Sequence, residues 1–141
     1  MSNALNSVAS EKALYEVIAP HIGGAELSDG TLAEARQKID GGPSVLYDVV
    51  VVLLSAEGAA VLARDAAAQD FVRDAFGHCK FIAYTAESEP LFKRAGILDD
   101  LDAGCFEIAA KKDVATFLDA AKELRYWPRE MNVDLDADAV R

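Results

Sequence analysis

The sequence predicts an α/β fold, a three-layer sandwich in which helices cover both faces of a parallel β-sheet. Segments rich in β-branched or aromatic residues alternate with segments of helical periodicity, and this alternation is typical of parallel sheets. The strongest strand signal is Ser44–Ser55, in which no polar side chain interrupts Val49–Leu54. Both faces of such a strand are apolar, so we expect it to lie in the centre of the sheet with helices above and below.

Composition limits the classes of partner. The chain has 141 residues, the length of one domain, and its 14 basic and 24 acidic side chains give a net charge of −10. This charge repels nucleic acid and anionic membranes, so neither is expected as a partner. The sequence shows neither a membrane-length apolar run nor a secretion signal, which predicts a cytoplasmic protein. Cys79 and Cys105 lack a C-x-x-C spacing and are expected to be reduced thiols.

The first forty residues give weaker signals. Residues 1–12 are small and polar, and we expect a flexible leader there. Ala13–Ala19 fits either a short strand or a helix capped by Ser10, and the sequence leaves both open. His21–Asp40 is rich in glycine and charge, which predicts a surface excursion with a tight turn at Asp29–Gly30.

Two helices are predicted directly after the first strong strand. Ala56–Ala63 is small and apolar, which favours a short helix that packs closely against a neighbour. Asp65 is a suitable cap for a second helix, which Gly77 and His78 end. Apolar residues recur in that helix at three- and four-residue spacing: Ala68, Phe71, Val72, Ala75 and Phe76.

Two strands and two helices complete the alternation. The predicted strands are Phe81–Tyr84 and Cys105–Ala109. The predicted helices are Glu87–Ala95, which Gly96 terminates, and Asp113–Trp127, which Pro128 stops. The last helix is the clearest amphipathic segment, and its inward residues are expected to be Val114, Phe117, Leu118, Ala121 and Leu124. The domain is therefore expected to span residues 13–130, with residues 131–141 as an acidic tail.

No set of residues specifies a reaction, and we predict no catalytic, cofactor-binding or metal-binding residue. The turn after Ser44–Ser55 lacks the glycine patterns that hold phosphate groups. A nucleophile elbow would follow the strand that ends at Tyr84, but Thr85 or Ser88 is expected there as a helix cap rather than as a nucleophile. At the third turn, Asp113 is expected to lie at the positive end of a helix dipole.

The remaining polar and aromatic residues have structural explanations. His21 lies in a predicted loop, and His78 is expected to bond the exposed carbonyls at a helix end. The acidic segment Asp99–Asp102 could hold calcium but lacks the EF-hand ligand spacing, so we expect it to be solvated. Cys79 precedes a strand at its amino end, which is the wrong end for an elbow. The aromatic pair, Tyr126 and Trp127, is expected to cover the core edge or to contact a partner.

Three segments resemble the C-terminal domain of the large-subunit catalases. They are G-G-P-S-V-L-Y-D-V-V-V-V-L-L-S, D-F-V-R-D-A-F-G-H-C-K-F-I-A-Y-T and E-L-R-Y-W-P-R-E, and the resemblance spans Tyr15–Val133. That domain is flavodoxin-like and is similar to the class I glutamine amidotransferase and PfpI superfamily. The resemblance implies a noncatalytic accessory domain that stabilises an oligomer or assists folding. Its parent enzyme would dismutate hydrogen peroxide.

The resemblance also implies which chemistry is absent. Active PfpI-like relatives carry a cysteine followed by a histidine at the elbow, where this chain has Ala83 and Tyr84. Their glycine-rich turn is replaced here by Leu54–Ala56. The heme of the large catalases belongs to a separate domain, so no cofactor is expected in this chain. Two alternatives remain, a divergent hydrolase that uses Cys79 or Cys105 and a module that binds a small molecule such as flavin.

One departure from the family bears on the fold. The family's domain opens with a strand and a helix that this chain lacks, and that strand lies in the middle of the 2-1-3-4-5 sheet order. Its absence would leave open hydrogen-bonding groups along Val49–Leu54. Three outcomes are possible: Leu5–Ile18 forms a covering helix, a second copy pairs across a two-fold interface, or the chain is a fragment of a longer product. We expect a homo-oligomer, with a catalase heme domain as a further candidate partner.

Overall fold

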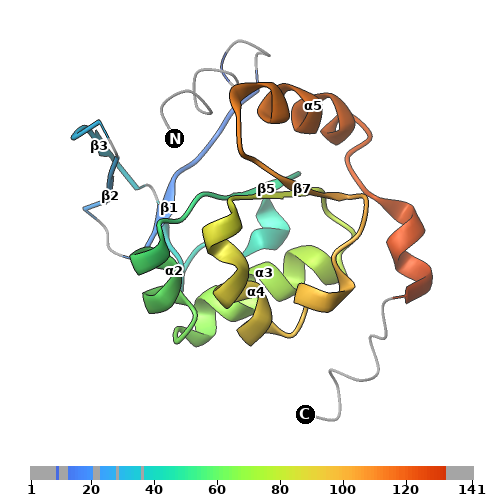
Figure 1. Ribbon diagram of the computed structural model, residues 1–141, viewed down its shortest axis with the longest axis horizontal. Coiled ribbons are helices and arrows are strands. Elements are labelled where there is room, and N and C mark those ends of the chain that lie inside the picture. Colours follow the sequence, from blue (N-terminus) through green and yellow to red (C-terminus); the bar gives the residue numbers. More distant parts are fainter. Residues whose placement is uncertain (1–8, 10–12, 21–22, 28, 36, 133–141) are drawn as a thin grey trace.

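The structure is a computed structural model that describes residues 9, 13–20, 23–27, 29–35 and 37–132. Its main sheet is parallel and contains β5 (Val50–Val52), β6 (Ile82–Tyr84) and β7 (Cys105–Glu107) in the order β5-β6-β7. Helices lie on both faces of this sheet, which Figure 1 shows nearly edge-on. The predicted α/β sandwich is therefore confirmed.

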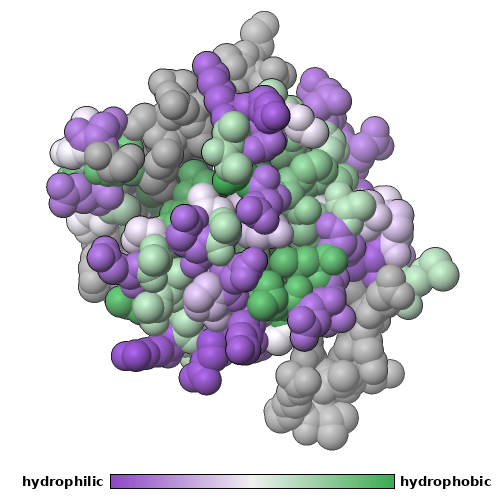
Figure 2. Space-filling view, in the orientation of Figure 1, coloured by the Kyte–Doolittle hydropathy of each residue, from purple (hydrophilic) through white to green (hydrophobic). Residues whose placement is uncertain are grey.

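The two faces of the sheet are covered differently. Helices α2 (Ala56–Leu62), α3 (Ala66–Gly77) and α4 (Glu89–Ala95) pack on one face, and α5 (Lys111–Ala121) lies on the other (Figure 1). The larger core cluster lies on the three-helix face and joins Val50, Val52 and Ile82 to all three helices. The smaller cluster lies beneath α5 and contains Phe81, Ala83, Phe117 and Ala121. Figure 2, in the same orientation, shows the molecule from the side, where hydrophilic residues are mixed with a hydrophobic patch.

The helix boundaries follow local sequence signals. Asp65 caps α3 as expected, because its carboxylate accepts hydrogen bonds from the amides of Ala67 and Ala68 at 2.8 and 3.2 Å. Helix α4 ends as expected at Gly96, which adopts the left-handed conformation with φ of 79°. The segment before α4, Ala86–Ser88, is a 3-10 turn rather than its first α-helical turn.

The position of β5 differs from the prediction. The strand contains only Val50–Val52 of the expected Ser44–Ser55 and lies at an edge of the sheet, while β6 is central. Ser44–Leu46 instead forms a 3-10 turn. Val51 is 42 % exposed, so the expectation that helices cover both faces of this strand was wrong. An apolar run indicates that a strand can be buried on both faces, but it does not specify strand order.

The last predicted helix also differs from the observed one. Helix α5 ends at Ala121 and not at Trp127. The chain leaves it through tight i, i−3 hydrogen bonds, and Leu124 has a φ of 66°, which no α-helix can accommodate. Leu124 is consequently 53 % exposed rather than inward. Pro128 does not stop α5, since it lies within a separate 3-10 helix, Trp127–Asn132.

The N-terminal part forms two small two-stranded sheets. β1 (Ile18–Ala19) pairs in parallel with β4 (Gln37–Lys38), and residues 13–17 have no regular structure. β2 (Ala25–Glu26) and β3 (Leu32–Ala33) form an antiparallel hairpin around the predicted turn. In that turn the Thr31 amide donates to the Asp29 carboxylate at 3.0 Å. The expected leader lies outside the described residues except for Ala9, and the expected tail except for Met131 and Asn132.

Candidate functional site

The carboxyl ends of the strands are the first candidate site, because ligands gather there in open parallel sheets. The Thr85 hydroxyl lies 3.0 Å from the carbonyl oxygen of Leu54, to which it donates, and accepts from the Leu54 amide at 3.2 Å. The Ser88 hydroxyl donates to the carbonyl of Val52 at 3.2 Å. Both residues lie at N-cap positions, Thr85 of the 3-10 turn and Ser88 of α4, as expected, but neither side chain makes a capping hydrogen bond. Their hydroxyls instead fasten β5 and the residues just after it to the segment that follows β6.

The predicted elbow position contains no nucleophilic side chain. Ala83 is the middle residue of β6, is 1 % exposed and packs in the smaller core cluster. Tyr84 ends the strand, and its ring lies edge-on to Phe92 with the ring centroids 5.0 Å apart. In the preceding turn Ser55 caps α2 by accepting from the Gly58 amide at 3.1 Å. The polar groups at this end of the sheet are therefore engaged in holding the backbone together.

Both cysteines lie at the opposite end of the sheet. Cys79 follows α3 with a φ of 58° and is 4 % exposed, and Cys105 is the first residue of β7. Burial raises the pKa of both thiols, that of Cys105 to about 11. A nucleophilic cysteine needs a depressed pKa, so the environment of these thiols favours the unreactive protonated form.

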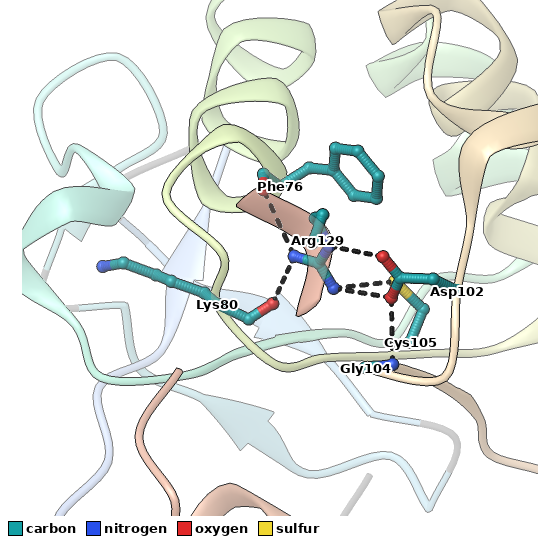
Figure 3. A network of polar contacts seen from close by, with 6 residues as sticks. All are labelled: Phe76, Lys80, Asp102, Gly104, Cys105 and Arg129. Carbon is teal, nitrogen blue, oxygen red and sulfur yellow. Dashed lines mark hydrogen bonds and ion pairs between the residues drawn. The ribbon is translucent and has the colours of Figure 1, made fainter. Parts of the chain in front are cut away.

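A buried arginine forms the most extensive polar network among the described residues (Figure 3). The Arg129 guanidinium pairs with both carboxylate oxygens of Asp102, with Nε–Oδ2 and Nη2–Oδ1 distances of 2.7 and 2.9 Å. Its Nη1 donates to the carbonyls of Lys80 and Phe76 at 2.8 and 3.2 Å. The Phe76 ring lies against the guanidinium, 4.3 Å from its carbon, and Cys105 Sγ lies 3.5 Å from Nη2. Planar bidentate pairing of this kind requires arginine rather than lysine.

The network ties the end of the chain to the amino ends of β6 and β7. Arg129 is 1 % exposed, although arginine is rarely buried unless it is paired. Burial alone would raise the pKa of Asp102, but hydrogen bonds from Arg129 and the Gly104 amide hold that pKa below its usual value. The expectation that Asp102 is solvated was therefore wrong. Its arginine partner lies 27 residues away in sequence, and no local pattern links the two.

A second buried cation lies nearby. Lys80 is fully buried, and its ammonium group donates to the carbonyls of Ser44 and Tyr47, which pins the 3-10 turn before β5. Figure 3 shows its side chain pointing away from Arg129. A cavity of about 300 Å³ lies beside it and is lined in part by His78 and Trp127. The sequence analysis did not predict that Lys80 is buried. The signal for its burial was its position directly before Phe81 and Ile82, in a predicted buried strand.

The remaining predicted residues have structural roles. Nδ1 of His78 lies 2.7 Å from the carbonyl of Asp74 at the end of α3, as expected, while His21 lies outside the described residues. The Asp113 carboxylate accepts from the amides of Ala109 and Ala110 at the start of α5, which lowers its pKa. Tyr126 packs edge-on against Phe81 and covers the core edge, whereas Trp127 is 62 % exposed. Within the described ranges, no group of three or more potential ligands is arranged to hold a metal ion.

Comparison with known proteins identifies the family. The family described as "C-terminal domain found in long catalases" matches residues 1–131. The chain belongs to this family. The match confirms the resemblance to the C-terminal domain of the large catalases that the sequence motifs indicated.

Three similar proteins are named as catalases. Over 129 residues, 92 % of the chain, the sequence is 50 % identical to "Catalase C" of Rhizobium meliloti, of which the match covers 18 %. It is 35 % identical over 114 residues, 79 % of the chain, to "Catalase HPII" of Mycobacterium avium, of which 16 % is covered. A third relative, "Catalase-1" of Neurospora crassa, is 26 % identical over 92 residues, which are 65 % of this chain and 12 % of the relative.

The match concerns one part of these relatives. The chain spans less than a fifth of the length of each of these relatives.

Across the described residues, none of the helices has the length and apolar character needed to span a membrane.

Proposed function

We propose that the chain is a noncatalytic accessory domain of a longer catalase, which removes hydrogen peroxide through a heme held elsewhere. The domain would stabilise the assembly, promote its oligomerisation or assist its folding. The observation that carries this proposal is the carboxyl end of β6, where Ala83 offers no nucleophile and the hydroxyls of Thr85 and Ser88 are bonded to the carbonyls of Leu54 and Val52. Family membership supplies the peroxide context.

In this proposal the heme lies in another part of the longer protein. Two points support it: the family resemblance gives the heme to a separate domain, and the chain spans less than a fifth of the length of each relative.

The test measures heme binding and peroxide consumption by the purified 141-residue chain. Titration with hemin should produce no saturable Soret shift, and the rate of peroxide consumption should equal that of hemin alone. A stoichiometric Soret shift or catalytic peroxide consumption by the purified chain would contradict the proposal.

Thiol labelling distinguishes the proposal from cysteine-based hydrolysis. Because burial raises the pKa of both thiols, iodoacetamide at neutral pH should modify Cys79 and Cys105 in the folded protein far more slowly than in urea. Mass spectrometry gives both rates. Rapid labelling of one cysteine in the folded state would favour the hydrolase.

Contacts with other subunits are also part of the proposal. Trp127 and Met131, in the 3-10 helix that carries Arg129, are 62 % and 93 % exposed. Tryptophan and methionine are enriched at protein interfaces, so this helix is a candidate contact between copies or with a heme domain. Sedimentation of the wild type and of Trp127→Glu should show weaker self-association for the variant, and equal association would exclude this surface.

A further inference from the structure

The cavity beside Lys80 combines charged groups with apolar surface. It has a volume of about 300 Å³ and is lined by the 3-10 turn before β5, the link from α3 to β6 and the segment 125–130. The side chains that bear on its chemistry are those of Val45, Lys80, Arg125, Trp127 and Glu130. Its volume is at the lower end of the range for ligand sites, so a ligand that fits must be small.

Two cations line this cavity without a carboxylate partner. Lys80 is fully buried, and its ammonium group donates to backbone carbonyls. Nη1 of Arg125 donates to the carbonyls of Asp48 and Leu124 at 3.3 and 2.8 Å, while its Nε and Nη2 bond to none of the described residues. No ion pair between described residues includes either cation. Because buried charges in proteins are normally paired, this arrangement favours an anion from outside the chain.

The charges around the cavity suit a single negative group. Burial first, and the positive charge of Arg125 second, lower the pKa of Lys80, whereas Asp48 opposes this shift. An anion beside both cations would offset their repulsion. Lys80 and Arg125 against Glu130 leave the lining with an excess of one positive charge when His78 is neutral, although the whole chain has a net charge of −10. A monoanion would balance this excess.

We propose that this cavity binds a small aromatic monocarboxylate. Nε and Nη2 of Arg125 donate to the two carboxylate oxygens, because a guanidinium matches a planar carboxylate with two parallel hydrogen bonds. Lys80 is fully buried, so it acts through its charge and not by contact. The ring of the ligand lies against Trp127 and Val45, which are 62 % and 57 % exposed. Inorganic phosphate would meet the cations but would leave this apolar surface unused.

The experiment uses the full 141-residue chain, with benzoate as the probe. Trp127 is the only tryptophan in the sequence, so its fluorescence and its indole N–H signal in NMR spectra report on this cavity directly. Benzamide is the matched control ligand because it has the shape of benzoate without the charge, and acetate has the charge without the ring. We expect benzoate to bind saturably with a dissociation constant of about 1 mM or below. Benzamide and acetate should bind at least ten-fold more weakly.

Four variants assign the contacts. Arg125→Met should weaken benzoate binding at least ten-fold, and Arg125→Lys should restore part of the affinity, because lysine keeps the charge but not the paired donors. Arg64→Met, an exposed arginine outside the lining, should not change binding. Glu130→Gln removes a like charge from the lining and should tighten binding about two-fold, a gain that a folding defect cannot imitate. Urea unfolding verifies that each variant is folded.

Three results would overturn the inference. The first is equal binding of benzoate and benzamide, and the second is unchanged benzoate binding by Arg125→Met. The third is a Trp127 signal that shifts with the concentration of the chain and not with benzoate, which would assign this surface to contact between copies. The inference goes beyond the accessory role and involves neither hemin nor peroxide, so the ligand site and that role can fail independently.

Discussion

The Arg129 network and the β5 edge differ in how many of their hydrogen-bonding groups have a partner within the chain. At the network, a buried guanidinium bonds to one carboxylate and two backbone carbonyls, and an aromatic ring lies against it. At the β5 edge, Val51 is 42 % exposed, and neither its amide nor its carbonyl has a partner among the described residues. In the first region the buried hydrogen-bonding groups find their partners within the domain. In the second, one amide and one carbonyl of the edge strand face away from the sheet.

This difference predicts where substitutions matter. A substitution that removes one partner from the Arg129 network should destabilise the fold, because it leaves buried polar groups without hydrogen bonds. The β5 edge should tolerate many changes in the isolated chain, because solvent already reaches it. The predictions below test this contrast, from the largest expected effect to the smallest.

Arg129→Met should have the largest effect, a loss of about 3 kcal/mol in the free energy of unfolding. The change removes the partner of Asp102 and leaves the carbonyls of Phe76 and Lys80 buried without donors. The Asp102 side chain is 25 % exposed, which keeps the loss at the low end for a buried ion pair. Urea unfolding followed by circular dichroism measures it. The control is Arg64→Met, an exposed arginine, which should change stability by less than about 0.5 kcal/mol.

Gly104→Ala should cost about 2 kcal/mol because its methyl group would enter the network. A Cβ at this position would lie 2.7 Å from both Arg129 Nη2 and the Tyr126 ring. The matched control is Gly77→Ala, whose Cβ would contact nothing within 4 Å at the end of α3. The control should be neutral or slightly stabilising because alanine favours a helix. Equal midpoints for both variants in urea would show that the network adapts to the methyl group.

Val50→Ala and Val51→Ala compare two neighbours in one strand. Val50 is 4 % exposed in the larger core, so its truncation should cost about 2 kcal/mol. Val51 is 42 % exposed, so its truncation should cost less than about 0.5 kcal/mol in the isolated chain. Thermal melts of both variants measure the difference, and similar costs would contradict an open edge.

The smallest expected effect is the acid dependence of the network. The folded pKa of Asp102 lies below its unfolded value of about 3.9, so its contribution to stability is complete above that value. The contribution is lost as pH falls through the folded pKa. Urea midpoints between pH 5 and pH 2 should therefore decline, and less steeply in Arg129→Met. Asp113 has a lowered pKa for a different reason, two backbone amides, so its share of the decline should persist in that variant.

Sequence reasoning was most successful where local chemistry decides the structure. The alternation of strands and helices, the Asp65 cap and the left-handed Gly96 all depend on residues within a few positions of one another. The family match followed from three short motifs for the same reason. Local signals also located the turn at Gly30, whose φ is 82°.

The failures concern long-range partners. Strand order cannot be read from an apolar run, so β5 was placed in the centre although it lies at an edge. Thr85 and Ser88 bond to the carbonyls of Leu54 and Val52, 31 and 36 residues away, and not to the amides that follow them. The pairing of Arg129 with Asp102 likewise depends on the folded backbone.

The place of Arg129 near the end of the described chain affects the order in which the protein can fold during synthesis. Its guanidinium donates hydrogen bonds to the carbonyls of residues 76 and 80, and these bonds cannot form until residue 129 has left the ribosomal tunnel. Until then the amino ends of β6 and β7 lack their main cross-link. Ribosome-bound chains stalled before that point should be cleaved readily by protease, and chains released after it should resist cleavage. The cross-link through Arg129 can therefore form only after both strands have been synthesised.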